Sequence, residues 1–254
     1  MIYEPSPFCY TKKKKRADQM DRAFIIGDIH GNYDELLQLL THWDPETETL
    51  IFLGDYIDRG PDSLQVVRHV MQLVEEGAIA LKGNHEEMMM EWTRGEHEAR
   101  YLRNGGEETL QSFMTASRGA NDLSFAEFRS VLLTEFSEEV TFLNERPLYY
   151  EWNQFLFVHA GVDLLKENWR DGTDDDFLWI REPFHTGSNQ TGKQIVFGHT
   201  PVKILNRDKS FNPWFSECGT KIGIDGGLVF GGQLNGLKVA ADGRTDWVKV
   251  EAKS

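Results

Sequence analysis

The first third of the chain alternates between short apolar runs and helical patterns, and this alternation limits the fold more than any other feature of the sequence. The apolar runs have the length of buried strands, and the segments between them carry apolar residues at helical spacing. Because parallel strands need a long crossover connection, such strand–helix–strand units predict a parallel sheet. In chain order, the strand-like and helical segments are 23–27, 33–43, 49–54, 62–77, 78–83 and 85–95.

The second half of the chain has a different pattern. Residues 96–145 are mostly polar with helical spacing, which predicts a helical insertion on the sheet. Short strand patterns separated by Gly, Asn and Asp then predict a second, antiparallel sheet. These strand patterns cover 147–152, 154–161, 194–200, 221–225, 227–240 and 245–251. Two sheets packed face to face with helices outside would bury the apolar strands on both faces.

Charge, hydropathy and cysteine content exclude several classes of protein. The net charge of −14 argues against a general nucleic-acid binder, which would carry a basic face. No run reaches the roughly 20 apolar residues of a membrane span, and no apolar segment follows the basic run 12–16 as in a secretory signal. The two cysteines, Cys9 and Cys218, form no disulfide framework, so we expect a cytoplasmic protein. We expect a flexible basic arm at 1–21 and a single catalytic domain at 22–254.

Five of the apolar runs end in Asp, Asn or His next to Gly or Ala. Any one of these residues alone would be a turn residue or a helix cap. Together they supply the oxygen and imidazole ligands that Mn²⁺, Fe or Zn²⁺ accept, whereas Ca²⁺ prefers oxygen only. In an open α/β sheet, ligands gather at the carboxyl ends of the strands. The predicted ligands are Asp28, His30, Asp55, Asn84, His159 and His199.

Six ligands fit two metal ions better than one, provided that one carboxylate bridges the ions. Asp55 is the predicted bridge, because it follows the middle strand of the first strand–helix–strand–helix–strand unit.

The blocks "GDIHG", "GDYIDRG", "GNHE", "HAG" and "GHT" resemble, in order and spacing, the signature of the phosphoprotein phosphatase family of metallophosphoesterases. The resemblance covers roughly residues 23–240 and is strongest to short bacterial and bacteriophage members; "NGG" at 104–106 also has a counterpart there. It implies a four-layer α/β/β/α sandwich, in which helices flank two mixed sheets. It also implies two metal ions at the sheet ends and direct attack of a metal-bound hydroxide on phosphorus.

The resemblance implies a role for each site residue. Asp28, His30 and Asp55 would bind the first ion, and Asp55, Asn84, His159 and His199 the second. His85 would be the general acid for the leaving alkoxide, and Asp58 would raise its pKa and hold its proton. Arg59 and Arg181 would bind phosphate oxygens through their planar guanidinium groups. Asp225 would lie near the site without binding metal.

The expected activity is therefore that of a protein serine/threonine phosphatase. Its partner would be a phosphorylated protein or peptide and its cofactor two divalent ions, with Mn²⁺ the first choice. A cysteine-based phosphatase is excluded, because Lys15 and Ile224 stand where the arginine of its Cys-x₅-Arg motif would be required.

Two alternatives stay open. "GDIHGNYDEL" and "RGPDSL" also resemble symmetrical bis(5'-nucleosyl)-tetraphosphatases, although Asp58 and Glu86 favour the phosphoprotein group. A non-enzymatic binding module on the same fold is the other alternative, and the complete ligand set argues against it. Oligomeric state is left open by the sequence.

Overall fold

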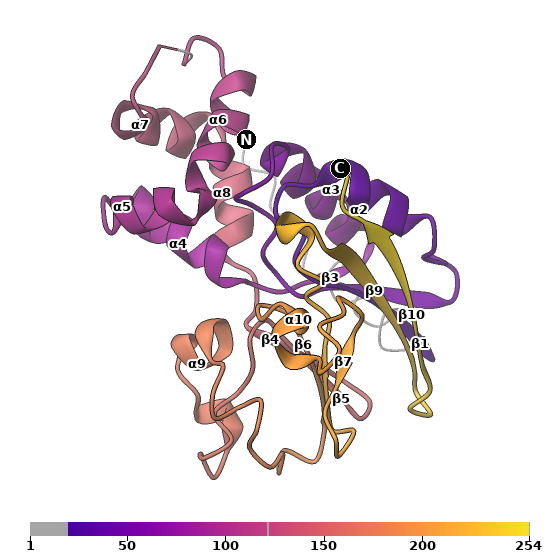
Figure 1. Ribbon diagram of the computed structural model, residues 1–254. Coiled ribbons are helices and arrows are strands. Elements are labelled where there is room, and N and C mark those ends of the chain that lie inside the picture. The colour runs from indigo at the N-terminus through magenta and orange to yellow at the C-terminus, as the bar shows by residue number, and fades with distance from the viewer. Residues whose placement is uncertain (1–19, 121, 254) are drawn as a thin grey trace, which may run out of the picture.

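Two five-stranded sheets pack face to face in the computed structural model, which describes residues 20–120 and 122–253 (Figure 1). The first sheet has the order β10-β9-β1-β2-β3. Its parallel strands are β1 (Arg22–Ile26), β2 (Glu48–Phe52) and β3 (Ile79–Ala80), connected by helices α2 (Tyr33–Leu40) and α3 (Ser63–Glu76). The predicted strand–helix alternation is therefore confirmed. The predicted basic arm at 1–21 lies almost entirely outside the described residues.

Strands β9 (Gln233–Ala240) and β10 (Thr245–Glu251) belong to the first sheet, so their predicted place in the second sheet is wrong. Strand β9 runs antiparallel to β1, with Leu237 opposite Ile25. That pairing joins segments from opposite ends of the chain, and no local pattern signals it. The start of the predicted strand at 227–240 is instead a 3₁₀ turn, η3 (Leu228–Phe230), which separates two glycines with positive φ.

The second sheet is mixed, as the resemblance implies, and the antiparallel sheet expected from the turn pattern is wrong. Its order is β4-β5-β6-β8-β7, in which β5, β6 and β8 are parallel. The β4–β5 and β7–β8 connections are hairpins, whereas the long segments after β5 and β6 allow parallel crossovers. The strands are β4 (Tyr149–Trp152), β5 (Phe155–Val158), β6 (Gln194–Phe197), β7 (Trp214–Phe215) and β8 (Lys221–Gly223).

Alternate side chains of the strands divide the core into layers, because successive residues of a strand point to opposite faces. Phe24 and Ile26 of β1 pack under the helices, while Ile25 packs against the second sheet. The far face of the second sheet is covered by a thin layer that includes η2 (Trp169–Asp171) and α9 (Asp174–Trp179), and α10 (Val202–Leu205) follows β6.

The segment predicted as a helical insertion, 96–145, contains a run of short helices. They follow α4 (Asn84–Thr93) and form a group beside α2 and α3, in magenta and pink in Figure 1. Helices α6 and α8 pack against α3, so the segment shares the core of the first sheet. Its elements are α5 (Glu98–Tyr101), the π-helical turn η1 (Leu102–Gly106), α6 (Glu107–Ala116), α7 (Phe125–Glu135) and α8 (Ser137–Asn144).

Met88, Met89 and Met90 on α4 are buried in that core. Among the described residues, no helix is both long and apolar enough to span a membrane.

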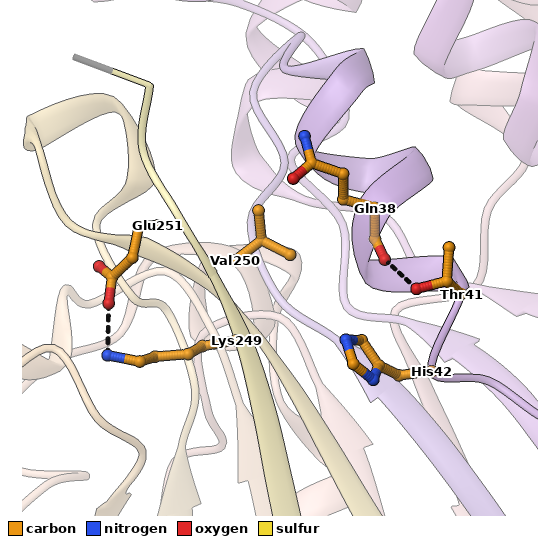
Figure 2. Close-up of a pocket in the computed structure, with 6 residues that line it drawn as sticks. All are labelled: Gln38, Thr41, His42, Lys249, Val250 and Glu251. Carbon is orange, nitrogen blue, oxygen red and sulfur yellow. Dashed lines mark hydrogen bonds and ion pairs between the residues drawn. The ribbon is translucent and has the colours of Figure 1, made fainter.

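A surface hollow of about 490 Å³ lies between the end of α2 and strand β10 (Figure 2). Lys249 and Glu251 form an ion pair at its rim, and His42 lies on the opposite side. None of the predicted site residues lines this hollow. The candidate active site therefore lies elsewhere, at the carboxyl ends of the strands.

Candidate metal centre and active site

The six predicted metal ligands meet at the carboxyl ends of strands from both sheets. Two of them follow β1, one follows β2, one opens α4, and the other two follow β5 and β6. All six side chains are buried, with exposed fractions of 7% or less. In chain order they are Asp28, His30, Asp55, Asn84, His159 and His199.

Contacts between donor atoms link these side chains into one cluster. Asn84 Oδ1 lies 2.8 Å from both His159 Nε2 and His199 Nδ1. Asp55 Oδ1 lies 3.5 Å from His159 Nε2, and Asp55 Oδ2 lies 3.6 Å from His30 Nε2. Donor atoms of Asp28, Asp55 and His159 all lie within 4.8 Å of one another. The Asp55 carboxylate thus lies between the two predicted ligand sets, where a bridging ligand would be required.

Hydrogen bonds to backbone carbonyls fix the two histidines that present Nε2. His30 Nδ1–H donates to Ile57 O at 2.9 Å, and His159 Nδ1–H donates to Leu53 O at 2.9 Å. This tautomer leaves each Nε2 lone pair facing the cluster, as in most histidine–metal sites. Burial lowers the pKa of His30 and lowers that of His159 to about 3. Both imidazoles are therefore neutral at physiological pH, the form that binds a metal.

The carboxylates of the cluster repel one another. Burial raises the pKa of Asp28 well above its ordinary value, and the charges of Asp225 and Asp55 raise it further. The pKa of Asp55 is also raised, first by burial and then by the charge of Glu86. Buried carboxylates held together in this way are stabilised by cations.

The donor set and its charge therefore fit divalent metal ions, with the six predicted ligands around them. When bound, such ions supply a water of lowered pKa as the nucleophile and stabilise charge on the phosphate oxygens.

The backbone of the site is held in strained conformations. Among the described residues, eight other than glycine have positive φ, and five of them are His30, Asp55, Asp58, Arg59 and His199. Such residues cost about 1–3 kcal/mol each and persist where surrounding contacts enforce them. A Cβ atom added to Gly83 or Gly198 would lie 2.2 Å from an oxygen of Asp55 or Asp28. Glycine is thus required where the backbone passes under each carboxylate.

Asp58 and His85 form a buried pair beside the cluster. Asp58 Oδ2 lies 2.6 Å from His85 Nδ1, and neither side chain is more than 2% exposed. His85 Nε2 points toward the centre, 3.9 Å from Asp55 Oδ2. The predicted contact is thus present, but the pKa of His85 is lowered rather than raised, because burial and the nearby Arg59 dominate. Burial raises the pKa of Asp58 to about 7, so burial opposes charge on both members of the pair.

The two predicted phosphate-binding arginines are placed differently. Arg59 reaches into the cluster and donates from Nη1 to the unprotonated Nε2 of His30 at 2.6 Å. Its guanidinium also lies 5.4 Å from the ring of Phe230, which is 61% exposed. Arg181 lies beyond the end of α9 and is exposed, yet its charge helps to lower the pKa of His159 and His199.

Arg100 on α5 lies over the ring of Trp179, with its guanidinium carbon 4.6 Å from the ring centroid. Trp179 in turn meets His199 edge to face, at 5.9 Å between ring centroids. The helical segment thus contacts the rim of the site through Arg100. No spacing in the sequence signals this contact.

Glu86 supports the site in a way that the sequence analysis missed. Its buried carboxylate accepts the N–H groups of Asp55, Tyr56 and Gly83 at 2.8–2.9 Å. It thereby holds the loop that presents Asp55 and caps the start of α4. Glutamate three residues after a helix N-cap is a capping signal that could have indicated this role.

Replacing Glu86 with glutamine is expected to destabilise the fold by about 2–4 kcal/mol, because in either orientation the amide NH₂ would face at least one buried N–H that the carboxylate now accepts. The free energy of unfolding in urea measures the effect. The exposed Glu75→Gln on α3 is the control and should change it by less than about 0.5 kcal/mol. An equally small change in Glu86→Gln would show that the carboxylate does not hold the loop.

Comparisons with known proteins agree with this arrangement. A bis(5'-nucleosyl)-tetraphosphatase PrpE [asymmetrical] of Bacillus velezensis is 31% identical over 251 residues, covering 84% of this chain and 87% of that protein. Serine/threonine-protein phosphatase 1 of Salmonella typhimurium is 30% identical over 217 residues, covering 84% and 89%. A solved protein serine/threonine phosphatase of Saccharomyces cerevisiae shares the fold, with a TM-score of 0.56, 16% identity and coverage of 99% and 91%.

The family model for calcineurin-like phosphoesterases matches residues 22–231, a span that contains all ten predicted site residues. The chain belongs to the calcineurin-like phosphoesterase family of metal-dependent hydrolases, with a phosphoprotein phosphatase among its relatives.

Proposed function

We propose that this protein is a metal-dependent phosphomonoesterase that removes phosphate from serine or threonine side chains of proteins or peptides. The observation that carries the proposal is the buried Asp58–His85 pair, with Oδ2 and Nδ1 2.6 Å apart and Nε2 directed to the centre. A serine or threonine alkoxide is a strong base and leaves poorly without a proton. The phosphate groups released from a dinucleotide polyphosphate are weak bases and need no such acid.

In this proposal, each residue of the site has a separate role. Arg59 would bind and orient the phosphate group, and Arg181 would add positive charge at the rim. His85 would pass a proton from Nε2 to the leaving oxygen, while Asp58 keeps Nδ1 bound and the ring in place. Two divalent transition-metal ions complete the proposal, with Mn²⁺ the first choice and Fe or Zn²⁺ also compatible with the oxygen and nitrogen donors. The low cysteine content supports a cytoplasmic location.

Hydrolysis of a bis(5'-nucleosyl) tetraphosphate is the second candidate. Several relatives of this chain carry that name with the designation asymmetrical, whereas the sequence motifs suggested the symmetrical type. The exposed ring of Phe230 beside Arg59 also favours this candidate, since an aromatic face next to a phosphate-binding arginine could stack on a nucleobase.

A direct comparison of substrates tests the proposal. We expect kcat/KM for a phosphoserine peptide to exceed that for diadenosine tetraphosphate by about tenfold or more, because only the peptide benefits fully from a general acid. Both substrates are measured with the same Mn²⁺-loaded protein and at the same pH. A kcat/KM in favour of the dinucleotide would overturn the first choice. Its products would then identify the type, because asymmetrical cleavage gives ATP and AMP and symmetrical cleavage gives two ADP.

A further inference from the structure

Asp58 is held from two sides. Its Oδ2 bonds to His85, and its Oδ1 accepts the hydroxyl proton of Thr109 at 2.7 Å. Thr109 lies on α6, within the helical segment 96–145 that the sequence predicts only as an insertion on the sheet. The hydroxyl oxygen of Thr109 also accepts the backbone N–H of Asp58 at 2.7 Å. One buried hydroxyl therefore fixes both the backbone and the carboxylate of Asp58.

Thr109 is also hydrogen-bonded to a second buried hydroxyl. Ser63 Oγ lies 3.0 Å from Thr109 Oγ1, and the N–H of Asp58 also lies 3.2 Å from Ser63 Oγ. Since the Thr109 proton goes to Asp58 Oδ1, the Ser63 proton is the one that bridges the two hydroxyls. Asp58, Ser63 and Thr109 are all 0% exposed, so no water can replace a missing partner. Removal of the Thr109 hydroxyl would take a donor from Asp58 Oδ1 and the closer acceptor from the Asp58 N–H, whereas removal of the Ser63 hydroxyl would leave both Thr109–Asp58 bonds in place.

The same segment also holds Arg59. Asp58 and Arg59 have φ values of 71° and 70°, an unfavourable pair for residues other than glycine. The N–H of Arg59 donates to Gly105 O at 3.0 Å, four residues before Thr109. A Cβ on Gly105 would lie 2.6–2.7 Å from Arg59 Cγ and N, so the contact needs glycine there. The "NGG" block and α6 thus enforce the backbone conformation that presents both Asp58 and Arg59.

We infer that Thr109 is a positioning residue for the proposed reaction, which directs Asp58 Oδ2 onto His85 Nδ1 and so keeps the general acid aligned. This inference rests on the proposed phosphomonoesterase function. It assigns to the helical segment a role in catalysis, in addition to its packing on the first sheet. Thr109 itself touches no reacting atom, so its effect depends on His85.

The decisive variant is Thr109→Val, which keeps the shape of the side chain and removes the hydroxyl. We expect kcat on phenyl phosphate, a poor leaving group, to fall by about 10- to 100-fold, the effect of one lost hydrogen bond to a charged group. On p-nitrophenyl phosphate the loss should be under about threefold, and KM should stay within about twofold, because phosphate binding is unchanged. Thr109→Ser should recover phenyl phosphate activity to within about threefold, since it retains the hydroxyl.

Two further measurements separate positioning from general damage. Thr115→Val on the exposed face of the same helix is the matched control and should behave as wild type. In a His85→Asn background, Thr109→Val should change kcat on phenyl phosphate by less than about twofold, because its effect passes through His85.

Equal losses on both substrates, no loss on either, or additive losses in the double variant would overturn the inference. If Thr109→Val does not fold, Ser63→Ala tests the same network and should show a smaller loss with the same dependence on leaving group.

A spectroscopic measurement distinguishes failure of this inference from failure of the proposed function. In the zinc-loaded protein, the Nδ1 proton of His85 should give a low-field ¹H resonance, assigned by its absence in His85→Asn. The resonance should shift or vanish in Thr109→Val and persist in Thr109→Ser and Thr115→Val. An unchanged resonance in Thr109→Val would overturn the positioning role, whatever phosphate ester the protein cleaves. Wild-type protein inactive on phosphomonoesters would overturn the proposed function alone.

Discussion

Exchange of His85 for asparagine is expected to lower kcat on a phosphoserine peptide by about 10²- to 10⁴-fold, the range that a general acid contributes. His85 Nδ1 is engaged by Asp58 Oδ2 at 2.6 Å, so Nε2 is the atom free to give a proton to the leaving oxygen. Asparagine has about the same reach but cannot give up a proton in this pH range. The KM for the peptide should change little, because the phosphate is bound by other groups.

The dependence on leaving group distinguishes proton transfer from other functions of His85. On p-nitrophenyl phosphate, whose leaving group needs no proton, the loss in His85→Asn should be under about tenfold. The control is His42→Asn, an exposed histidine at the hollow between α2 and β10, which should leave both rates unchanged (Figure 2). Equal losses on the two substrates would contradict the acid role. In that case His85 would be acting on the metal centre, since its ring also lies within reach of His30 and Asp55.

The predicted metal ligands could be found from the sequence because of a simple geometric rule. Parallel strands end at the same edge of a sheet, so residues that follow different strands meet there. Asp28, Asp55 and His159 are far apart in the chain, yet their donor atoms lie within 4.8 Å. Apolar runs mark the strands well enough that errors of one or two residues at their ends do not move these side chains.

The supporting contacts could not be found in the same way, because they depend on how distant segments dock. Thr109 bonds to Asp58 across 51 positions, from a helix whose pattern indicates only that it is amphipathic. Strand β9 pairs with β1 across most of the chain, although its local pattern resembles that of the strands in the second sheet. Periodicity shows that an element forms and which face is buried, but the partner of that face is set by the tertiary fold.

For His85, the sequence predicted the contact with Asp58 but not the direction of the pKa shift. The sequence indicated that a carboxylate near His85 would raise its pKa, and Asp58 is indeed in contact with it. The depth of burial was not visible in the sequence, and burial opposes charge on both partners. The sign of the pKa shift is therefore set by desolvation and by Arg59, whereas the identity of the contact is set by the motif.

The cluster of acidic groups implies that function and stability oppose each other at Asp55. Its carboxylate is 2% exposed, and burial and Glu86 raise its pKa well above the ordinary value. In the absence of a bound cation, a neutral side chain of the same shape should be better tolerated. Asp55→Asn is therefore expected to stabilise the chelator-treated protein by about 1–2 kcal/mol, since functional sites are maintained at a cost in stability. Thermal unfolding in the presence of a chelator measures this effect.

When metal ions are present, Asp55→Asn should instead be harmful, because the variant should bind less metal and lose activity. Asp55 lies between His30 Nε2 and His159 Nε2, so it is the one carboxylate placed to serve both ions. We expect elemental analysis to find two ions per wild-type chain and at least one fewer in Asp55→Asn, with kcat lower by roughly 10³-fold or more. Asp21→Asn, an exposed change at the start of the described chain, should match wild type in both measurements. A variant that keeps two ions and wild-type kcat would show that Asp55 does not bridge them, and the ligand set would then have to be divided between two independent sites.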